Sequence, residues 1–187
     1  MKLVESFQQI NEHKKLYQIF CKAELLKIEV IQQFNVANVY ISNESLIHRR
    51  DIKALEIKLN STIFPREDGS IKIIENYPKM DKTAEEIYRE YDSSFLEELS
   101  EKGNIFRTVY LSSKIQANDN LLTLKIKDST LDRHYGSLMK SYFINTYRER
   151  FGLEIQVEIE YVKKNEKCDE TTRVDSRFYE MSKLENS

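Results

Sequence analysis

Three histidines and two cysteines are the side chains of this sequence most suited to metal binding or nucleophilic catalysis. His13, His48 and His134 lie far apart and lack the partner four residues away that a zinc-binding helix supplies. Cys21 and Cys168 are also widely separated, and neither has the basic surroundings that make a thiolate reactive. We therefore expect no metal site, no bound cofactor and no catalytic cysteine.

Glycines and carboxylates give a second test for catalysis. Four glycines scattered over 187 residues do not form a phosphate-binding loop. Carboxylates for two-metal phosphoryl transfer must converge from the ends of strands. The acids here are expected instead on helix surfaces and on the outer face of the last strand. We therefore expect no catalytic residues in this chain.

A small basic group is expected at the start of the helix that begins near Asp51. It consists of His48, Arg49, Arg50 and Lys53. Cations at this end of a helix gain nothing from the helix dipole, which favours negative charge there. Either solvent screens these charges or an anionic partner binds them. Single-stranded nucleic acid is the partner that this group would suit.

An acidic helix is the second unusual surface. Residues 83–101 contain a single arginine, Arg89, and seven acids: Glu85, Glu86, Glu90, Asp92, Glu97, Glu98 and Glu101. Residues 78–161 hold 12 basic and 15 acidic side chains, a net charge of −3. Such a face repels phosphates and suits a basic protein surface. We take Glu90, Glu97 and Glu98 as candidate protein-docking residues on an exposed face of this helix.

The composition indicates a globular protein with one or two small domains. Hydrophobic residues make up 40% of the chain, which is enough for a core, and no apolar run approaches the roughly 20 residues of a membrane span. The net charge of −2 argues against binding nucleic acid mainly through phosphates, so we expect weak or no direct contact. With no signal peptide in view and only two cysteines, we expect a cytoplasmic protein.

Hydrophobic periodicity predicts an α+β fold built from two consecutive helix–strand–strand–helix–strand (αββαβ) units. In the first unit we expect a helix over 6–22, strands over 26–30 and 36–42, a helix over 51–63 and a strand over 71–77. In the second we expect a helix over 83–101, strands over 105–111 and 121–127 joined by a turn at 116–120, a long helix from 129 to 151 and a strand over 153–161. Each unit would form a three-stranded sheet with helices on one face. The predicted domains are 1–77 and 78–161, followed by a charged tail or linker over 162–187.

The last strand has the clearest pattern in the chain. Leu153, Ile155, Val157, Ile159 and Tyr161 are expected to face the helices, while Glu154, Glu158 and Glu160 are expected to face solvent. The element order of the second unit also resembles a truncated type II KH fold. KH domains bind nucleic acid through a Gly-x-x-Gly loop, and this sequence contains none.

Several short runs occur in a distinctive order and spacing. They are Val39-Tyr40-Ile41-Ser42, Leu46-Ile47, Asp51-Ile52, Leu55-Glu56, Ile63-Phe64-Pro65, Ile71-Lys72-Ile73-Ile74-Glu75-Asn76-Tyr77, Tyr88-x-x-Tyr91, Leu96-Glu97-Glu98-Leu99, Asn104-Ile105-Phe106-Arg107 and Arg150-Phe151-Gly152. Over about residues 1–165 they resemble the N-terminal region of PolC, the DNA polymerase III α subunit of low-GC Gram-positive bacteria.

This resemblance implies two N-terminal domains, the second similar to the C-terminal domain of the clamp-loader τ subunit. The family is a DNA-directed DNA polymerase, but the resemblance carries no catalytic residue onto this chain, which we expect to be inactive by itself. It implies a non-catalytic protein-docking module in DNA replication, with other replisome proteins and the remainder of a polymerase chain as partners. The alternative is a KH-like domain that binds single-stranded nucleic acid through the basic group.

Overall fold

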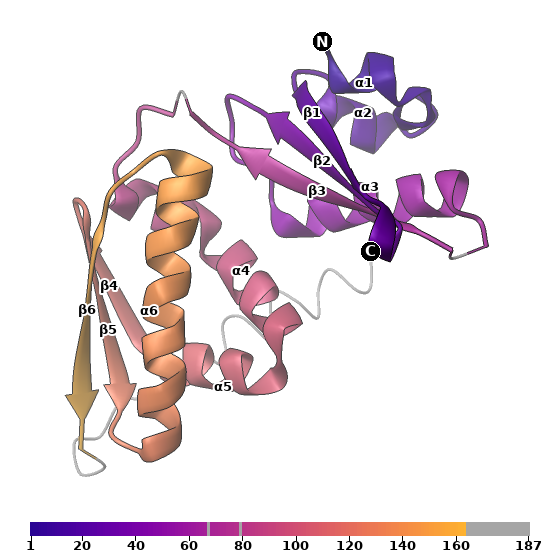
Figure 1. Ribbon diagram of the computed structural model, residues 1–187. Helices are drawn as coiled ribbons and strands as arrows, with labels where there is room; N and C mark the ends of the chain where they lie inside the picture. The colour runs from indigo at the N-terminus through magenta and orange to yellow at the C-terminus, as the bar shows by residue number, and fades with distance from the viewer. Residues whose placement is uncertain (67, 79, 164–187) are drawn as a thin grey trace.

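The computed structural model describes residues 1–66, 68–78 and 80–163, which form an α+β protein with two three-stranded sheets (Figure 1). The first sheet and its helices comprise α1 (Leu3–Ser6), η1 (Gln8–Ile10), α2 (Lys14–Phe20), β1 (Glu24–Ile31), η2 (Gln32–Phe34), β2 (Val36–Ser42), α3 (Arg49–Ile63) and β3 (Ser70–Asn76). The second sheet and its helices comprise α4 (Ala84–Lys102), α5 (Asn104–Ser112), β4 (Lys114–Asn118), β5 (Leu121–Lys127), α6 (Thr130–Phe151) and β6 (Gln156–Val162).

Capping residues explain where the two longest helices begin and end. The Thr83 side chain accepts a hydrogen bond from the Glu86 N–H, and the Glu86 carboxylate accepts one from the Thr83 N–H, so α4 starts at a capping box. At the start of α6 the Ser129 hydroxyl accepts from the Asp132 N–H. Gly152 ends α6 at φ 66°, in the left-handed region that glycine adopts without strain.

The two sheets share one topology. Their strand orders are β1-β2-β3 and β4-β5-β6. In each sheet the first two strands pair antiparallel and the last two pair parallel, with a helix in the connection between them. Residues that pair directly lie on the same face. Ile28, Val39 and Ile73 therefore share the helix-facing side of the first sheet, and Ile115, Leu124 and Ile159 share that side of the second.

Each sheet packs against a hydrophobic core of its own. In the second core, aromatic rings from α4 and α6 surround Phe95, which lies 5.3 Å from Phe143 and 5.9 Å from Tyr147 between ring centroids. Tyr77, which directly follows β3 of the first sheet, is fully buried in this second core and stacks on Phe151 at 5.5 Å. The first residue of the connection between the sheets is therefore packed into the second core.

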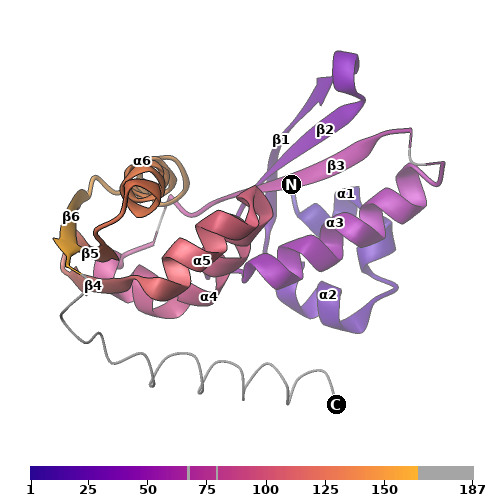
Figure 2. The ribbon, with the colours of Figure 1, turned by 90° about the horizontal axis from the view of Figure 1, so that it is seen from below.

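The helices cover the two sheets unequally. Figure 2 shows β1 and β2 extending beyond α1, α2 and α3, whereas β4 and β5 lie close under the helices of the second half. As a result, Ile28 and Val30 lie on the core side of the first sheet but are 48% and 66% exposed. Their equivalents on the edge strand β4 of the second sheet are better covered, since Ile115 is buried and Ala117 is half-buried.

Two of the expected elements have a different secondary structure from the one predicted. The run expected as a strand over 105–111 is the helix α5, whose Val109 and Tyr110 are buried against neighbouring helices. A short apolar run fits either a strand or a helix, and here packing between α4 and α6 selects the helix. The run 116–120 was expected as a turn, but β4 extends to Asn118, and only Asp119 and Asn120 connect it to β5.

Element boundaries differ at both ends of the described chain. The single helix expected over 6–22 is divided into α1, η1 and α2, which pack Leu3, Ile10 and Phe20 into the first core by separate short turns. The last strand begins at Gln156 rather than at residue 153. Its alternation is confirmed at Ile155 and Val157, which are buried, and the three glutamates that were expected to face solvent are all exposed: Glu154, Glu158 and Glu160.

Three further residues of that alternation are less buried than expected. Leu153 and Ile159 are half-buried, and Tyr161 is exposed, with its ring under the guanidinium of Arg133 at 4.3 Å. The end of β6 therefore extends beyond the core. The tail or linker expected over 162–187 falls, from residue 164 onward, outside the described residues. None of the helices in the described part has the length and apolar character needed to cross a membrane.

Candidate functional site

The two candidate surfaces predicted from the sequence meet each other inside the protein. The basic group lies at the start of α3, and α3 packs against the acidic helix α4. Figure 1 shows α4 between α6 and the first sheet, with the start of α3 beside it. The residues expected to bind external partners therefore form part of a junction between the two halves of the chain.

Arg49 is the centre of the first group of polar contacts at this junction. Its guanidinium donates to Glu56 on its own helix, at 3.3–3.4 Å, and to Glu101 on α4, at 3.1–3.3 Å. Lys53 also reaches Glu101, at 3.3 Å. The backbone N–H of Arg49 donates to the Ser94 hydroxyl at 3.1 Å, so α4 supplies an acceptor for the first turn of α3. We call these residues the Arg49 cluster.

A second and more deeply buried group surrounds Arg150, near the end of α6. The Arg150 guanidinium donates in bidentate fashion to Glu98 on α4, at 2.6 and 3.0 Å. It lies 3.2 Å from Glu75 of β3 and 3.1 Å from the hydroxyl of Tyr91. The Tyr142 hydroxyl donates to Oε2 of Glu98 at 2.7 Å, an oxygen that also accepts from Arg150. We call these five residues the Arg150 cluster.

The Arg150 cluster joins elements from both halves of the chain. Glu75 comes from the first sheet, whereas the other members come from α4 and α6. The Tyr91 hydroxyl lies between the two carboxylates, 3.0 Å from Glu75 and 3.2 Å from Glu98, and has one hydrogen to donate. The cluster is therefore a polar centre where β3 meets α4 and α6.

Burial and charge set the protonation equilibria of the cluster. Burial raises the pKa of Glu75, and the neighbouring carboxylate of Glu98 raises it further, against the lowering effect of Arg150. Burial lowers the pKa of Arg150, but Glu75 and Glu98 outweigh this effect and hold the pKa well above its ordinary value. Burial and the two carboxylates also raise the pKa of the Tyr91 hydroxyl. Arg150 is thus a permanent cation shared by two acids.

Charge at the Arg49 cluster is balanced in the same way. Partial burial raises the pKa of Glu101, but the hydrogen bond from Arg49 and the charges of Arg49 and Lys53 lower it more, and the pKa lies below its usual value. Burial also raises the pKa of Glu97, which the nearby charges of Arg50 and Lys53 partly oppose. The cations of α3 and the anions of α4 therefore neutralise each other.

The structure corrects the expected exposure of two candidate residues. Glu98 was expected on an exposed face but is buried in the Arg150 cluster, and Arg49 was expected to be exposed but is largely covered by Glu56 and Glu101. Glu97 is half-buried, and Glu90 is exposed and paired with Lys82. The expectation failed because it treated α4 as facing only its own half of the chain.

Two candidate residues from different predicted surfaces line one open cleft. His48 from the basic group and Glu90 from the acidic helix border a cleft of about 380 Å³. The remaining lining residues are Glu44, Ser45, Leu46 and Lys82. Lys82 pairs with Glu90, and His48 lies 3.5 Å from the Ser94 hydroxyl. The described part of the chain holds no group of three or more histidine, cysteine or acidic side chains arranged to bind a metal.

Glu75 is the cluster residue whose role the sequence indicates most directly in retrospect. Ile71, Ile73, Glu75 and Tyr77 alternate along β3, and the two isoleucines face the first core. A carboxylate at a buried position of this strand needs a cation or a hydrogen-bond donor close to it. Arg150 carried no comparable signal, because a basic residue in the last turn of a helix is ordinarily explained by the helix dipole.

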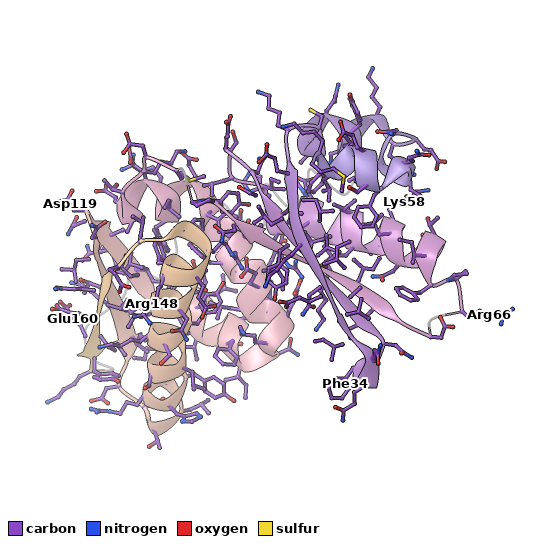
Figure 3. The ribbon with its side chains drawn as sticks, turned by 45° about the horizontal axis from the view of Figure 1, so that its top comes forward. Phe34, Lys58, Arg66, Asp119, Arg148 and Glu160 are labelled. Carbon is purple, nitrogen blue, oxygen red and sulfur yellow. The ribbon has the colours of Figure 1, made fainter. Side chains whose placement is uncertain are left out.

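A separate exposed feature lies on the β1–β2 hairpin, which we define as residues 24–42. Leu26, Val30 and Phe34 are 52%, 66% and 68% exposed, and Ile28 and Ile31 are also exposed. Figure 3 shows Phe34 at the tip of this hairpin, away from the helices. Single exposed apolar side chains are ordinary, but five occur here within nine residues, and Ile28 and Val30 share one face of β1.

The fold and site define an α+β protein with a charged junction and an exposed apolar hairpin. Comparison with known proteins adds little to this description. The chain matches no protein-family model and no curated protein. Two solved structures of the periplasmic domain of the type III secretion inner-membrane protein PrgH from S. typhimurium (fragments 170–362 and 170–392) share 14% identity with it. Each comparison covers 83% of this chain and 70% of the other, at a TM-score of 0.27.

Proposed function

We propose that this chain is a non-catalytic protein-docking module from the N-terminal region of a PolC-type DNA polymerase III, acting in DNA replication. The ordered series of short motifs supports the family, and the second half of the chain supports the KH-like part of the proposal. There α4, β4, β5, α6 and β6 follow the truncated type II order, with α5 added. The proposal places the protein in the cytoplasm with the other replisome proteins.

The exposed hairpin is the observation that carries the docking function. Leu26, Ile28, Val30 and Phe34 present apolar surface on one side of the protein, and their burial against a partner would remove that surface from water. The acidic residues first considered for docking are less suitable. Glu98 is buried, Glu97 is half-buried, and Glu90 is paired with Lys82. The proposed docking surface is therefore the hairpin rather than α4.

Direct binding measurements test this proposal. The full chain is immobilised and exposed separately to two purified proteins of the same bacterium: the clamp-loader τ subunit, and a PolC polymerase lacking its N-terminal region. We expect at least one to bind, and we expect Val30→Ser combined with Phe34→Ser to weaken binding about tenfold or more, because exposed apolar anchors dominate such contacts.

Ile57→Ser provides a matched control, because Ile57 is 63% exposed on α3, outside the hairpin. This control should bind like the parent chain. The proposal is wrong if neither protein binds, or if the control loses as much affinity as the hairpin variant. A primer-extension assay is the companion test. The purified chain should neither extend nor degrade a primed template in the presence of magnesium.

A further inference from the structure

The outer edge of β1 is open over a short, defined segment. β1 is an edge strand, and residues at the N-terminus pair with its beginning: Lys2 bridges Glu24, and the Leu25 N–H donates to the Met1 carbonyl at 2.8 Å. Within the described ranges, no backbone partner occupies the outer edge from Leu26 to Ile31. Such an edge presents free N–H and C=O groups that another strand can use.

Charges on this segment alternate in a self-complementary way. Lys27 and Glu29 lie on the same face of the strand, since they pair with Tyr40 and Asn38 of β2. They form an ion pair with each other, and the Tyr40 hydroxyl donates to Glu29 at 2.8 Å. Ile28 lies between them on the opposite, helix-facing side. The segment therefore has one charged face and one apolar face.

We infer that a second copy of this chain pairs with the open edge, β1 against β1, in antiparallel orientation. A symmetric antiparallel pair has its two-fold axis at a single residue. An axis at Lys27 or at Glu29 would place that charge opposite itself. An axis at Ile28 places Lys27 opposite Glu29 of the second copy at two symmetric positions, which is the favourable arrangement.

The extent of the open edge leads to the same register. With the axis at Ile28, residues 27–29 of the two copies pair directly, and Leu26, where the pairing of β1 with β2 shifts register, faces Val30 of the other copy. This segment begins directly after the part covered by Met1 and Lys2. The two first sheets join into one six-stranded sheet, with the helices of both copies on one side. Ile28 then packs against Ile28 of the second copy, which covers a residue that is half exposed in one chain alone.

Charge exchange tests the pairing and its register. Sedimentation of the full chain over a wide concentration range should show a monomer–dimer equilibrium. Lys27→Glu and Glu29→Lys should each weaken the dimer about tenfold, because symmetry places like charges opposite each other at two positions. The double variant Lys27→Glu/Glu29→Lys restores complementarity and should dimerise to within about twofold of the parent chain. Circular dichroism melting checks that each variant is folded.

A cysteine placed on the axis gives an independent measurement. In a background with Cys21→Ser and Cys168→Ser, Ile28→Cys should form an intermolecular disulfide on mild oxidation. Directly opposed residues have Cα atoms about 4.5–5.5 Å apart, within the range of a disulfide. Ile57→Cys is the matched control, because Ile57 is also exposed but lies on α3 outside the paired segment, and it should form no intermolecular disulfide.

Three outcomes would overturn the inference. They are a parent chain that stays monomeric at every concentration, a dimer that is indifferent to the charge reversals, and an Ile28→Cys variant that cross-links no faster than the Ile57→Cys control. In the first case, slow exchange of the amides over residues 26–31 would show that one chain covers its own edge.

The inference rests on the proposed function only because both use the same hairpin. Different results would contradict each of them. Binding to the τ subunit or to the truncated polymerase by a monomeric chain would overturn the dimer alone. A dimer that binds neither protein would overturn the replisome proposal alone.

Discussion

The two sheets of this protein have the same strand order and pairing but different cover. The second sheet lies under α4, α5 and α6, of 19, 9 and 22 residues, and most of its core-facing residues are buried. The first sheet lies under α1, α2 and α3, of 4, 7 and 15 residues, and the far half of β1 is left exposed. Helix length thus decides how much apolar surface a sheet of this topology leaves for a partner.

Charged residues show the reverse contrast. The polar residues that looked available from the sequence are used inside the molecule, in the Arg49 and Arg150 clusters. The apolar residues that looked like ordinary core positions, such as Ile28 and Val30, are on the surface. If the proposed docking surface is right, apolar exposure marks a binding surface in this protein better than charge does. The following predictions test that contrast.

The largest effect is expected at the Arg150 cluster. Arg150→Met removes the cation that Glu75 and Glu98 share and leaves two buried carboxylates uncompensated, so we expect a loss of about 3–5 kcal/mol in the free energy of unfolding. Arg148→Met is the control, because Arg148 pairs with Glu154 on the surface and should contribute less than about 1 kcal/mol. Urea denaturation measures both. Similar losses in the two variants would contradict the structural role of the cluster.

The next effect compares equivalent edge-strand positions of the two sheets. Ile115→Ala in β4 of the second sheet should cost about 2–5 kcal/mol, because it leaves a cavity in a buried core. Ile28→Ala, at the matching position in β1 of the first sheet, should change stability by less than about 0.5 kcal/mol when measured on the monomer. If Ile28→Ala costs as much as Ile115→Ala, the first sheet is covered in solution and the contrast between the sheets is wrong.

A smaller effect separates two neighbouring arginines. Arg49→Ala removes hydrogen bonds to Glu56 and Glu101 and should cost about 1–3 kcal/mol, whereas exposed Arg50→Ala should cost less than about 0.5 kcal/mol. Thermal melting distinguishes them.

The same pair tests the nucleic-acid alternative. The parent chain should show no salt-sensitive binding to single-stranded DNA or RNA. Binding that the double variant Arg49→Ala/Arg50→Ala abolishes would instead support a nucleic-acid role for the basic group.

The smallest effect is a pH dependence at Glu75. Because the pKa of Glu75 is raised in the folded protein, the folded state binds its proton more tightly than the unfolded state. The parent chain should therefore gain stability relative to Glu75→Gln as the pH falls from neutral through the raised pKa towards the ordinary value of 4.5, and lose it again as the pH rises. Denaturation of both proteins across this range, with exposed Glu154→Gln as control, measures the difference. A difference that stays constant with pH would contradict the raised pKa.

Strong local patterns were sufficient to predict part of the fold. The bounds of β2 and β5 were predicted correctly, because alternating apolar residues define both strands. The capping box at Thr83 and the glycine end of α6 at Gly152 were also readable from local sequence. By contrast, α5 depends on packing between helices that are distant along the chain, and periodicity over seven residues could not determine it.

The site was less predictable than the fold, because its contacts join residues far apart in the sequence. Arg49 and Glu101 are 52 positions apart, as are Glu98 and Arg150. Each looked like a surface charge on its own helix, and only the packing of α3 and α6 against α4 brings the pairs together. The exposure of the hairpin had the same origin, since it depends on how far the helices reach rather than on the strand itself.

The position of Tyr77 has a consequence for how the molecule unfolds. Its N–H donates to the Arg150 carbonyl at 2.7 Å, and its hydroxyl accepts from the Ile47 N–H at 3.0 Å, while its ring lies in the second core. Withdrawing this side chain opens both cores at once, so the two halves should unfold cooperatively rather than as independent foldons. The slowest-exchanging amides of β2 and β5 should then report one common opening free energy.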